Sequence, residues 1–304
     1  MAQRPSSRQL SRFRQRGVAL VMVLWILLLV TIATGAYTLM ARMDQLEAHT
    51  ILSGTRARLA AEAGLNMAVL SLRDPDELTR LIPDGRPYLF DFQGVAVEVQ
   101  VTDERGKLDI NEANEQTLMT LFSNNGLDPD FAEELAAAIL DWRDADDMER
   151  PNGAELPAYE SAGLQVGPGD RPFIMTEELL QVLGMSWDLY TRIEPGLSVF
   201  SNAAMPEAAY APWQALLALP DMTEQDALNF VTERQSQDTL VGAGLALPSG
   251  QVAMARGRGL TYSILAKATL PNGIWDQVEA TIRLGGGQDG FPYRVLRWRE
   301  GFHH

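Results

Sequence analysis

The chain has 304 residues, of which 25 are basic, 40 are acidic, 46% are hydrophobic and none is cysteine. This length and composition suit one or two folded domains with a hydrophobic core. The lack of cysteine excludes disulfides, thiolate catalysis and zinc sites with cysteine ligands, and the net charge of −15 argues against general polyanion binding.

A basic leader and a membrane helix begin the chain. Residues 1–17 contain five arginines and no acidic side chain, and residues 18–41 contain no charged side chain at all. A helix over 18–41 would be roughly 36 Å long, enough to cross a bilayer core of about 30 Å. The apolar run is long for a cleaved secretory signal, and no small-residue cleavage site follows it. The positive-inside rule therefore predicts a single-pass inner-membrane protein with a cytoplasmic N-terminus and a periplasmic domain after about residue 42.

Residues 42–111 are predicted to hold a helical stalk and the first part of a sheet. The helical pattern continues without proline up to Pro75, so the anchor and stalk form one helix of about 50 residues. The stalk carries apolar residues at spacings of three and four, which predict an amphipathic face: Leu46, Ile51, Leu52, Leu59, Ala63, Met67 and Leu70.

Strand patterns occur on both sides of a long helical region. Alternating valines predict a strand over 95–101, and a turn at 103–106 would return the chain as a second strand over 107–110. Further strands are predicted over 260–269, 274–284 and 293–298, within a second part of the sheet that spans 241–304. One antiparallel sheet, interrupted by an inserted domain, explains this order of elements.

The predicted insert, residues 112–240, is helical and strongly acidic. It contains 24 acidic and 5 basic residues, a balance of −19. Helix starts are predicted at four residues that commonly cap helices: Asn114, Asp128, Thr176 and Thr223.

Three helix–turn–helix segments in the insert, 118–143, 179–193 and 216–234, resemble helix-hairpin-helix modules, which often bind DNA phosphates through glycine amides. A membrane-anchored DNA-uptake receptor is therefore an alternative function. However, the second and third turns are Gly184–Ser186 and Pro220–Met222 instead of paired glycines, and the domain is anionic. We therefore expect no nucleic-acid partner.

The densest group of candidate ligands lies between residues 141 and 160. Carboxylates gathered at a helix C-terminus are unfavourable unless a cation neutralises them, and oxygen donors without histidine or cysteine favour calcium. The spacing is not that of an EF-hand, and a solvated acidic loop is the alternative. Two acids one turn apart could also serve acid–base catalysis, but no nucleophile accompanies them. The candidate ligands are Asp144, Asp147 and Glu155 first, then Asp141, Asp146, Asn152 and Glu160.

The segment Arg16–Met22, a basic leader ending in glycine before a long apolar helix, resembles the signal of type IV pilins and type II secretion pseudopilins. The resemblance implies that a prepilin peptidase cleaves after Gly17 and methylates the new N-terminal Val18. Most such subunits carry glutamate at the fifth mature position, whereas this chain has Met22. A subunit without this carboxylate is poorly suited to joining beneath another subunit, where it would leave a buried ammonium group unpaired.

The missing glutamate, the split sheet and the acidic insert together resemble the general secretion pathway protein K family of minor pseudopilins. This resemblance implies an α+β pseudopilin fold, with a long N-terminal helix against a small antiparallel sheet and a large all-α insert. It also implies a non-enzymatic tip subunit that partners two smaller minor pseudopilins and the major pseudopilin, with structural calcium in the acidic loop. A minor pilin of a type IV pilus is the nearest alternative, but it would be expected to lack this insert and to carry a cysteine pair.

Overall fold

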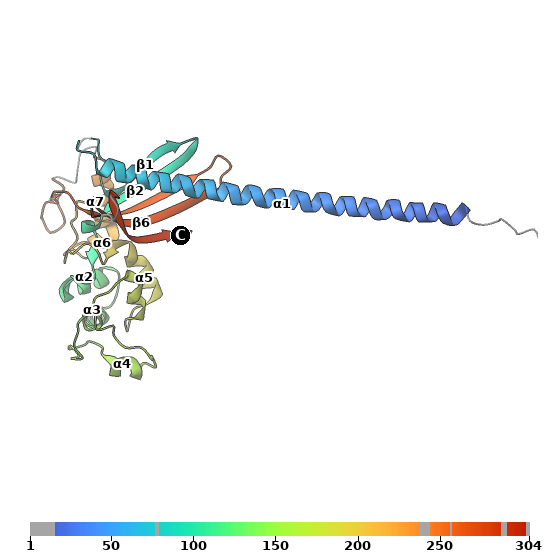
Figure 1. Cartoon of the computed structure of the whole chain (residues 1–304). Helices are drawn as coiled ribbons and strands as arrows, with labels where there is room; N and C mark the ends of the chain where they lie inside the picture. Colours follow the sequence, from blue (N-terminus) through green and yellow to red (C-terminus); the bar gives the residue numbers. More distant parts are fainter. Residues whose placement is uncertain (1–15, 77–78, 238–243, 256, 287–290, 302–304) are drawn as a thin grey trace, which may run out of the picture. The chain divides into compact units, whose positions relative to one another are not determined.

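The computed structural model describes residues 16–76, 79–237, 244–255, 257–286 and 291–301. Leader residues 1–15 and the predicted end of the insert, 238–240, lie outside the described residues. The chain divides into two compact units, Met1–Thr55 and Arg56–His304. Helix α1, Arg16–Leu72, contains residues of both units (Figure 1).

The part of α1 in the first unit has the properties of a membrane helix. Its apolar side chains are exposed from Val18 to Ile32, and the described chain contains one helix, over Val18–Leu72, that is long and apolar enough to span a membrane. The hydroxyls of Thr31, Thr34 and Thr38 donate to backbone carbonyls about one turn earlier. The helix therefore satisfies these polar groups internally, as an apolar surrounding requires.

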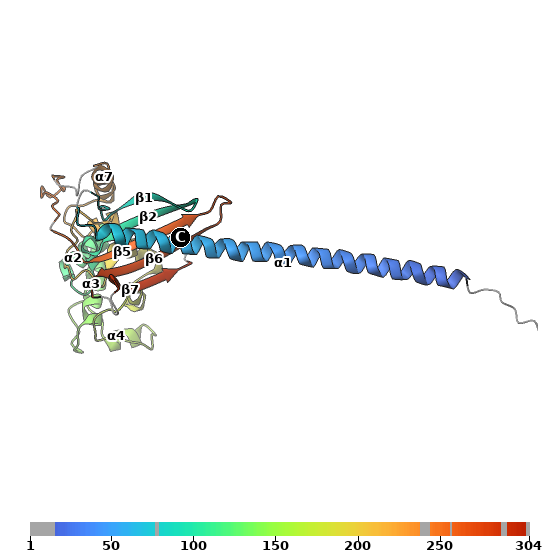
Figure 2. The same cartoon turned by 45° about the horizontal axis from the view of Figure 1, so that its top comes forward.

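The second unit is built on a five-stranded antiparallel sheet in the order β1-β2-β5-β6-β7, which confirms the predicted split sheet (Figure 2). The central pair joins the two halves of the sheet across the insert, with Val97 opposite Ala268. The strands are β1 (Asp84–Phe92), β2 (Val95–Asp103), β5 (Thr261–Thr269), β6 (Trp275–Leu284) and β7 (Tyr293–Glu300).

Two local predictions about the sheet were wrong. The segment 83–87, whose two prolines and glycine predict a turn, instead leads into edge strand β1 (Asp84–Phe92), where a bulge between Asp84 and Pro87 accommodates a proline that has no N–H to donate. After β2 the chain enters the short helix η1 (Glu104–Gly106), and β3 (Leu108–Asp109) does not return along β2. Instead, β3 pairs in parallel with β4 (Leu197–Ser198), so the insert contributes to a second small sheet.

Small residues on α1 make its closest contact with the sheet, beside the larger Leu65, Val69 and Leu72 of the same buried face. Ala57, Ala61 and Ala68 are fully buried against valines of β2 and alanines of β5. A Cβ atom on Gly64 would lie 2.5 Å from Cγ1 of Val97, so the close approach requires glycine.

The predicted apolar stripe of α1 lies on the other side of the helix. Leu59 and Leu70 are 57% and 72% exposed. The predicted stripe therefore does not coincide with the face that packs on the sheet, which periodicity alone could not assign.

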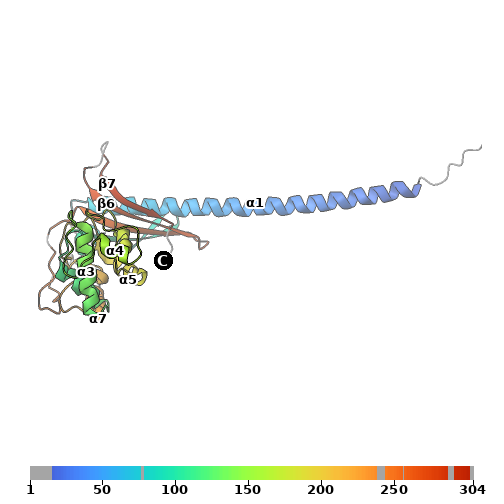
Figure 3. The ribbon, with the colours of Figure 1, turned by 90° about the horizontal axis from the view of Figure 1, so that it is seen from below.

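The insert is helical apart from β4, and it has its own hydrophobic core around Trp142, Tyr159 and Phe173. Figure 3 shows α3, α4 and α5 grouped on one side of this region. Its helices are α2 (Glu115–Asn124), α3 (Pro129–Arg143), α4 (Leu156–Ser161), η2 (Thr176–Gln181), α5 (Trp187–Ile193), η3 (Glu194–Gly196), α6 (Trp213–Leu216) and α7 (Glu224–Gln235).

The predicted caps are confirmed at three helices. The side chains of Asn114, Asp128 and Thr223 accept from backbone amides of the first turn. Thr176 was wrongly predicted as a cap, because it is the first residue of the 3-10 helix η2, and Met175 precedes it without a side-chain hydrogen bond.

Candidate functional site

The predicted processing residues lie at the start of α1. The helix begins at Arg16, so the proposed cleavage point between Gly17 and Val18 falls in its first turn. Val18 is 60% exposed and Met22 is 63% exposed, one helical turn further on. Nothing in this turn carries a carboxylate that could pair with an ammonium group.

A buried ionic group joins the insert to the sheet through β4. Glu104 of η1 is 2% exposed; it accepts from the hydroxyls of Ser198 in β4 and Ser263 in β5, and pairs with Lys107 Nζ at 2.9 Å. Burial alone would raise the pKa of Glu104, but Lys107 and the two hydroxyls hold it below its ordinary value. Because its donors come from three segments, this carboxylate fixes their relative positions.

A second buried group holds the end of the insert against β1. The Arg234 side chain, from α7, has no exposed surface; it donates to the carbonyls of Ala208, Ala211 and Asp84 at 2.7, 2.9 and 3.0 Å. The carboxylate of Asp84 also accepts from the guanidinium of Arg86 at 2.8–2.9 Å. Burial lowers the pKa of Arg234 to about 10, while the charge of Asp84 opposes this shift.

A third charged group lies where β7 meets the insert. Arg297 pairs with Glu177 of η2, and Arg299 pairs with Glu194 of η3 at 3.1 Å and with Glu279 of β6 at 2.7 Å. Together the three groups connect the insert to β1, β5, β6 and β7. The insert and the sheet accordingly belong to one compact unit, Arg56–His304.

The predicted metal loop is organised around Asp141 at the end of α3. This side chain is fully buried, and its Oδ2 accepts from the amide of Ala154 at 2.9 Å. The guanidinium of Arg150 donates to Asp141 Oδ1 at 2.7 Å and also to Asp144. A Cβ atom on Gly153 would lie 2.0 Å from Asp141 Oδ2, so only glycine allows the loop to fold back this closely.

Glu155 is the most perturbed acid of the loop. It is 5% exposed, and neither its Oε1 nor the buried Oδ1 of Asp144 has a hydrogen-bond partner. Burial, followed by the charges of Asp141, Asp170, Asp144 and Asp147, raises the pKa of Glu155 to about 7. The site therefore has an excess of negative charge that Arg150 does not fully neutralise.

The other predicted ligands are less closely associated. Asp146 is exposed and accepts a hydrogen bond from the amide of Met148, and Glu160 is exposed on α4. The side chain of Asn152 donates to Glu133 at 3.0 Å, and the backbone of Asn152 has a φ of 61°. Within the described ranges, no group of three acidic or histidine side chains has an arrangement that could hold a metal ion as it stands.

Asp170 was not among the predicted ligands, yet its charge acts on Glu155 from 15 residues further along the chain. The only local signal is the turn-forming run Gly167–Asp170, in which Asp170 has a φ of 46°. Such a run predicts a turn but not its tertiary contact.

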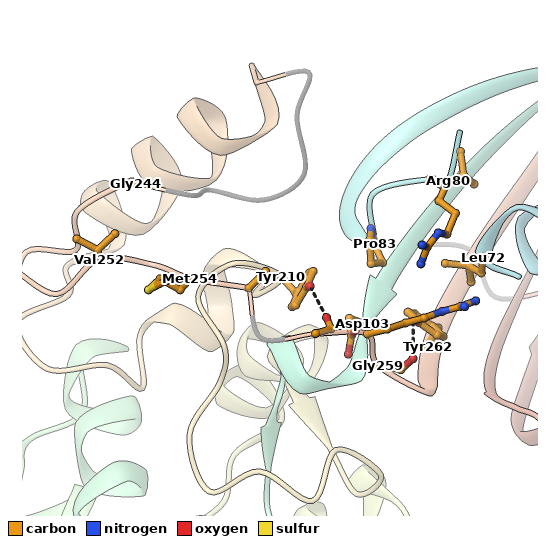
Figure 4. A pocket seen from close by; sticks show the side chains of 14 residues that line it. Leu72, Arg80, Pro83, Asp103, Tyr210, Gly244, Val252, Met254, Gly259 and Tyr262 are labelled. Atoms are coloured by element: carbon orange, nitrogen blue, oxygen red, sulfur yellow. Dashed lines mark hydrogen bonds between the residues drawn. The ribbon is translucent and has the colours of Figure 1, made fainter. Parts of the chain in front are cut away.

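A cavity of about 460 Å³ lies elsewhere, between the end of α1 and the start of β5 (Figure 4). Tyr210 donates to the carbonyl of Gly257 at 3.3 Å and Tyr262 to that of Gly259 at 2.7 Å, while Asp103 pairs with Arg105. These polar groups are engaged in fixing the cavity wall. The lining residues Gly244, Ala255 and Gly257 come directly after or before positions in the sequence that the structure does not describe.

Comparison with known families agrees with the fold. The model of the family described as Type II secretion system (T2SS), protein K matches residues 95–202, from β2 through most of the insert. The type II secretion system protein K of Pectobacterium carotovorum subsp. carotovorum is 27% identical over 276 residues, which cover 79% of this chain and 83% of that protein. The protein K of Klebsiella pneumoniae is 31% identical over 214 residues, covering 63% of this chain and 65% of that protein.

A solved structure has the same fold. It is a chain of the GspK-GspI-GspJ complex from the enterotoxigenic Escherichia coli type 2 secretion system, with a TM-score of 0.53 and 16% sequence identity. The match covers 86% of this chain and 99% of that chain. The expected pseudopilin-like fold, a long helix on an antiparallel sheet with a helical insert, is confirmed.

Proposed function

Because the chain belongs to the type II secretion system protein K family, a family of structural and non-enzymatic components, we propose that it is the minor pseudopilin at the tip of the pseudopilus. There it initiates or caps assembly for protein export across the outer membrane. Its partners in this role are the two smaller minor pseudopilins, corresponding to GspI and GspJ of the solved complex, and the major pseudopilin below them.

The observation that carries this proposal is the side chain at position 22. A subunit that joins beneath another meets that subunit's buried terminal ammonium, which costs several kcal/mol unless a carboxylate pairs with it. Met22 offers an apolar thioether in an apolar helix and cannot make this pair. At the tip there is no subunit above, so the carboxylate is not needed.

The outward face of α1 supports assembly through helix packing. Leu59 and Leu70 are exposed on the side of α1 that faces away from the sheet, and Leu46, Ile51 and Leu52 are exposed in the first unit. Exposed stripes of large apolar side chains mark association surfaces. We propose that this stripe packs against the helices of the two smaller minor pseudopilins.

Localisation of the chain in assembled pseudopili tests the tip position. We expect immunogold label against the insert at one end of each fibre and nowhere along its length. Label distributed along the shaft would refute the proposal. Met22→Glu is the matched variant: it should leave recruitment of the smaller subunits unchanged, because a tip subunit has no ammonium above it to pair with.

The N-terminal segment is proposed to anchor the chain in the bacterial inner membrane after a prepilin peptidase cleaves between Gly17 and Val18. The apolar α1 and the arginine-rich leader support this orientation, which leaves the unit Arg56–His304 in the periplasm. N-terminal sequencing of the purified chain should return Val18 as the first residue, in methylated form.

The acidic loop is proposed to bind calcium. Its donors are hard oxygens, Asp144 and Glu155 each hold a buried oxygen without a hydrogen-bond partner, and the pKa of Glu155 is raised to about 7 by neighbouring carboxylates. Asp144, Asp147 and Glu155 are the residues we expect to hold the ion, with Asp141 fixing the loop beneath it. When bound, calcium would supply the positive charge that the cluster lacks.

Calorimetric titration of the purified chain with calcium tests this site. We expect binding that Asp144→Ala abolishes and Glu160→Ala leaves intact, since Glu160 is exposed outside the cluster. Equal melting temperatures with calcium and with chelator would reject the site without affecting the tip proposal.

A further inference from the structure

A groove on the insert runs along one face of α3. It has a volume of about 390 Å³, and its floor includes Leu135 and Ala138 of α3. Residues 152–154 of the acidic loop also line it, as do Leu183, Gly184 and Ser186 before α5. The α3 residues that line the groove run from Phe131 to Ala138, a rise of about 10 Å, which is the length of two helical turns.

One exposed aromatic side chain lines this groove, and a second follows a lining residue in the chain. Phe131 is 65% exposed although it lines the groove, and Trp187, which follows the lining residue Ser186, is also 65% exposed. Exposed aromatic residues beside a hydrophobic groove are typical of protein interfaces, where such anchors contribute most of the binding free energy. Neither side chain is needed to fill the core of the insert.

The charges around the groove define its occupant. Glu134 lines the groove, Asp130 lies one helical turn before it on α3, and Asp188 follows Trp187 in the first turn of α5. No lysine or arginine is among the described residues that line it. The insert as a whole carries 24 acidic and 5 basic residues. Nucleic acids and anionic membranes would be repelled here, whereas a cationic protein segment would be attracted.

We propose that this groove binds a cationic amphipathic segment of a second protein, with one or two large apolar side chains between Phe131 and Leu135 and with lysine or arginine facing Glu134. A groove lined by about two turns of α3 suits about two turns of a partner helix, the mode in which an amphipathic helix places its apolar face in a hydrophobic groove. This function is independent of the tip position, because it involves only residues of the insert.

Peptide binding by the full chain in neutral-lipid nanodiscs tests the proposal. The probe is a fluorescent amphipathic peptide of about 15 residues, made of lysine and leucine, and a leucine–glutamate peptide of the same pattern is the control for charge. We expect the lysine peptide to raise fluorescence anisotropy above that of empty nanodiscs, and the glutamate peptide not to do so. Equal binding of the two peptides would overturn the charge assignment.

Matched variants locate the binding. Phe131→Ser should lower the affinity for the lysine peptide at least fivefold. Leu89→Ser, at a leucine 77% exposed on β1, should not change this affinity. Glu134→Lys should lower the affinity for the lysine peptide more than Glu233→Lys does, because Glu233→Lys makes the same charge change at an exposed position on α7. All four side chains are partly or fully exposed, so unchanged melting temperatures are expected. Equal affinities within each pair, or dimers of the chain that depend on Phe131, would refute the proposal.

Discussion

Asp84→Asn is expected to destabilise the unit Arg56–His304 strongly, because Asp84 is the counter-ion of two arginines at the junction of β1 and α7. The substitution keeps the size and shape of the side chain. It removes the negative charge that faces Arg86 at 2.8 Å and Arg234 at 3.5 Å. Both guanidinium groups would then lose the charge of this carboxylate, in a place where neither the Asp84 nor the Arg234 side chain has any exposed surface.

The magnitude follows from this burial. Removing one partner of a buried ion pair costs about 3–5 kcal/mol, because the remaining charge stays desolvated. In a unit of this size, each kcal/mol lowers the melting temperature by about 2–4 °C, so we expect a decrease of about 10 °C. Arg234 keeps its hydrogen bonds to the carbonyls of Ala208 and Ala211, so the fold should persist at low temperature.

Urea and thermal unfolding of the full chain measure the effect, with Asp91→Asn as the matched control. Asp91 lies on the same strand, is exposed, and accepts only from the amide of Gly94 at 3.2 Å, so its substitution should change the free energy of unfolding by less than about 0.5 kcal/mol. A second substitution, Arg234→Met, should restore part of the stability lost in Asp84→Asn. Equal stabilities of the Asp84 and Asp91 variants would refute the electrostatic explanation.

Three further predictions concern α1 and the acidic loop. Gly64→Ala should lower the free energy of unfolding by about 1–3 kcal/mol, because its Cβ would meet Val97 at 2.5 Å, whereas Gly54→Ala on the same helix, with no atom within 4 Å, should not lower it. Gly17→Leu should leave a full-length precursor in the membrane, which an immunoblot for the leader detects. In chelator, the free energy of unfolding should fall as pH rises from about 5 to 8, because the folded Glu155, with a pKa of about 7, binds more protons in this range than the unfolded one. Glu155→Gln should remove this slope, and a slope that persists would contradict the assignment.

The sequence predicted the architecture because its strongest signals are local. An uncharged stretch of 24 residues, alternating valines in β2, and capping residues such as Asn114 each indicate a structure that neighbouring residues determine. The pairing of β3 with β4 was missed because it joins Leu108 to Leu197 across 89 positions, and two-residue strands have no periodicity to detect. Strand β1 was missed because its proline and glycine indicate turns more strongly than its alternating side chains indicate a strand.

The candidate ligands show a similar limit. Composition placed an acidic cluster between residues 141 and 160, but it could not separate the buried Asp141 and Glu155 from the exposed Asp146 and Glu160. It also could not assign Arg150, which lies within the same run, as the cation that pairs with Asp141 and Asp144. Asp170 comes from another turn altogether. Tertiary packing decides which carboxylates share a site, and one sequence contains no record of that packing.

The two faces of α1 explain how one helix can serve both folding and assembly. The face with Ala57, Ala61 and Gly64 is committed to the chain's own sheet, which lies so close that a Cβ atom on Gly64 would be 2.5 Å from Val97. The face with Leu59 and Leu70 has larger side chains that the sheet leaves 57% and 72% exposed. Burial of each leucine would contribute about 1.5–3 kcal/mol to the free energy of association, and this contribution arises only when another helix covers the side chain. A folded monomer therefore retains a hydrophobic driving force for association, and in the proposed tip complex the two smaller pseudopilins would use it.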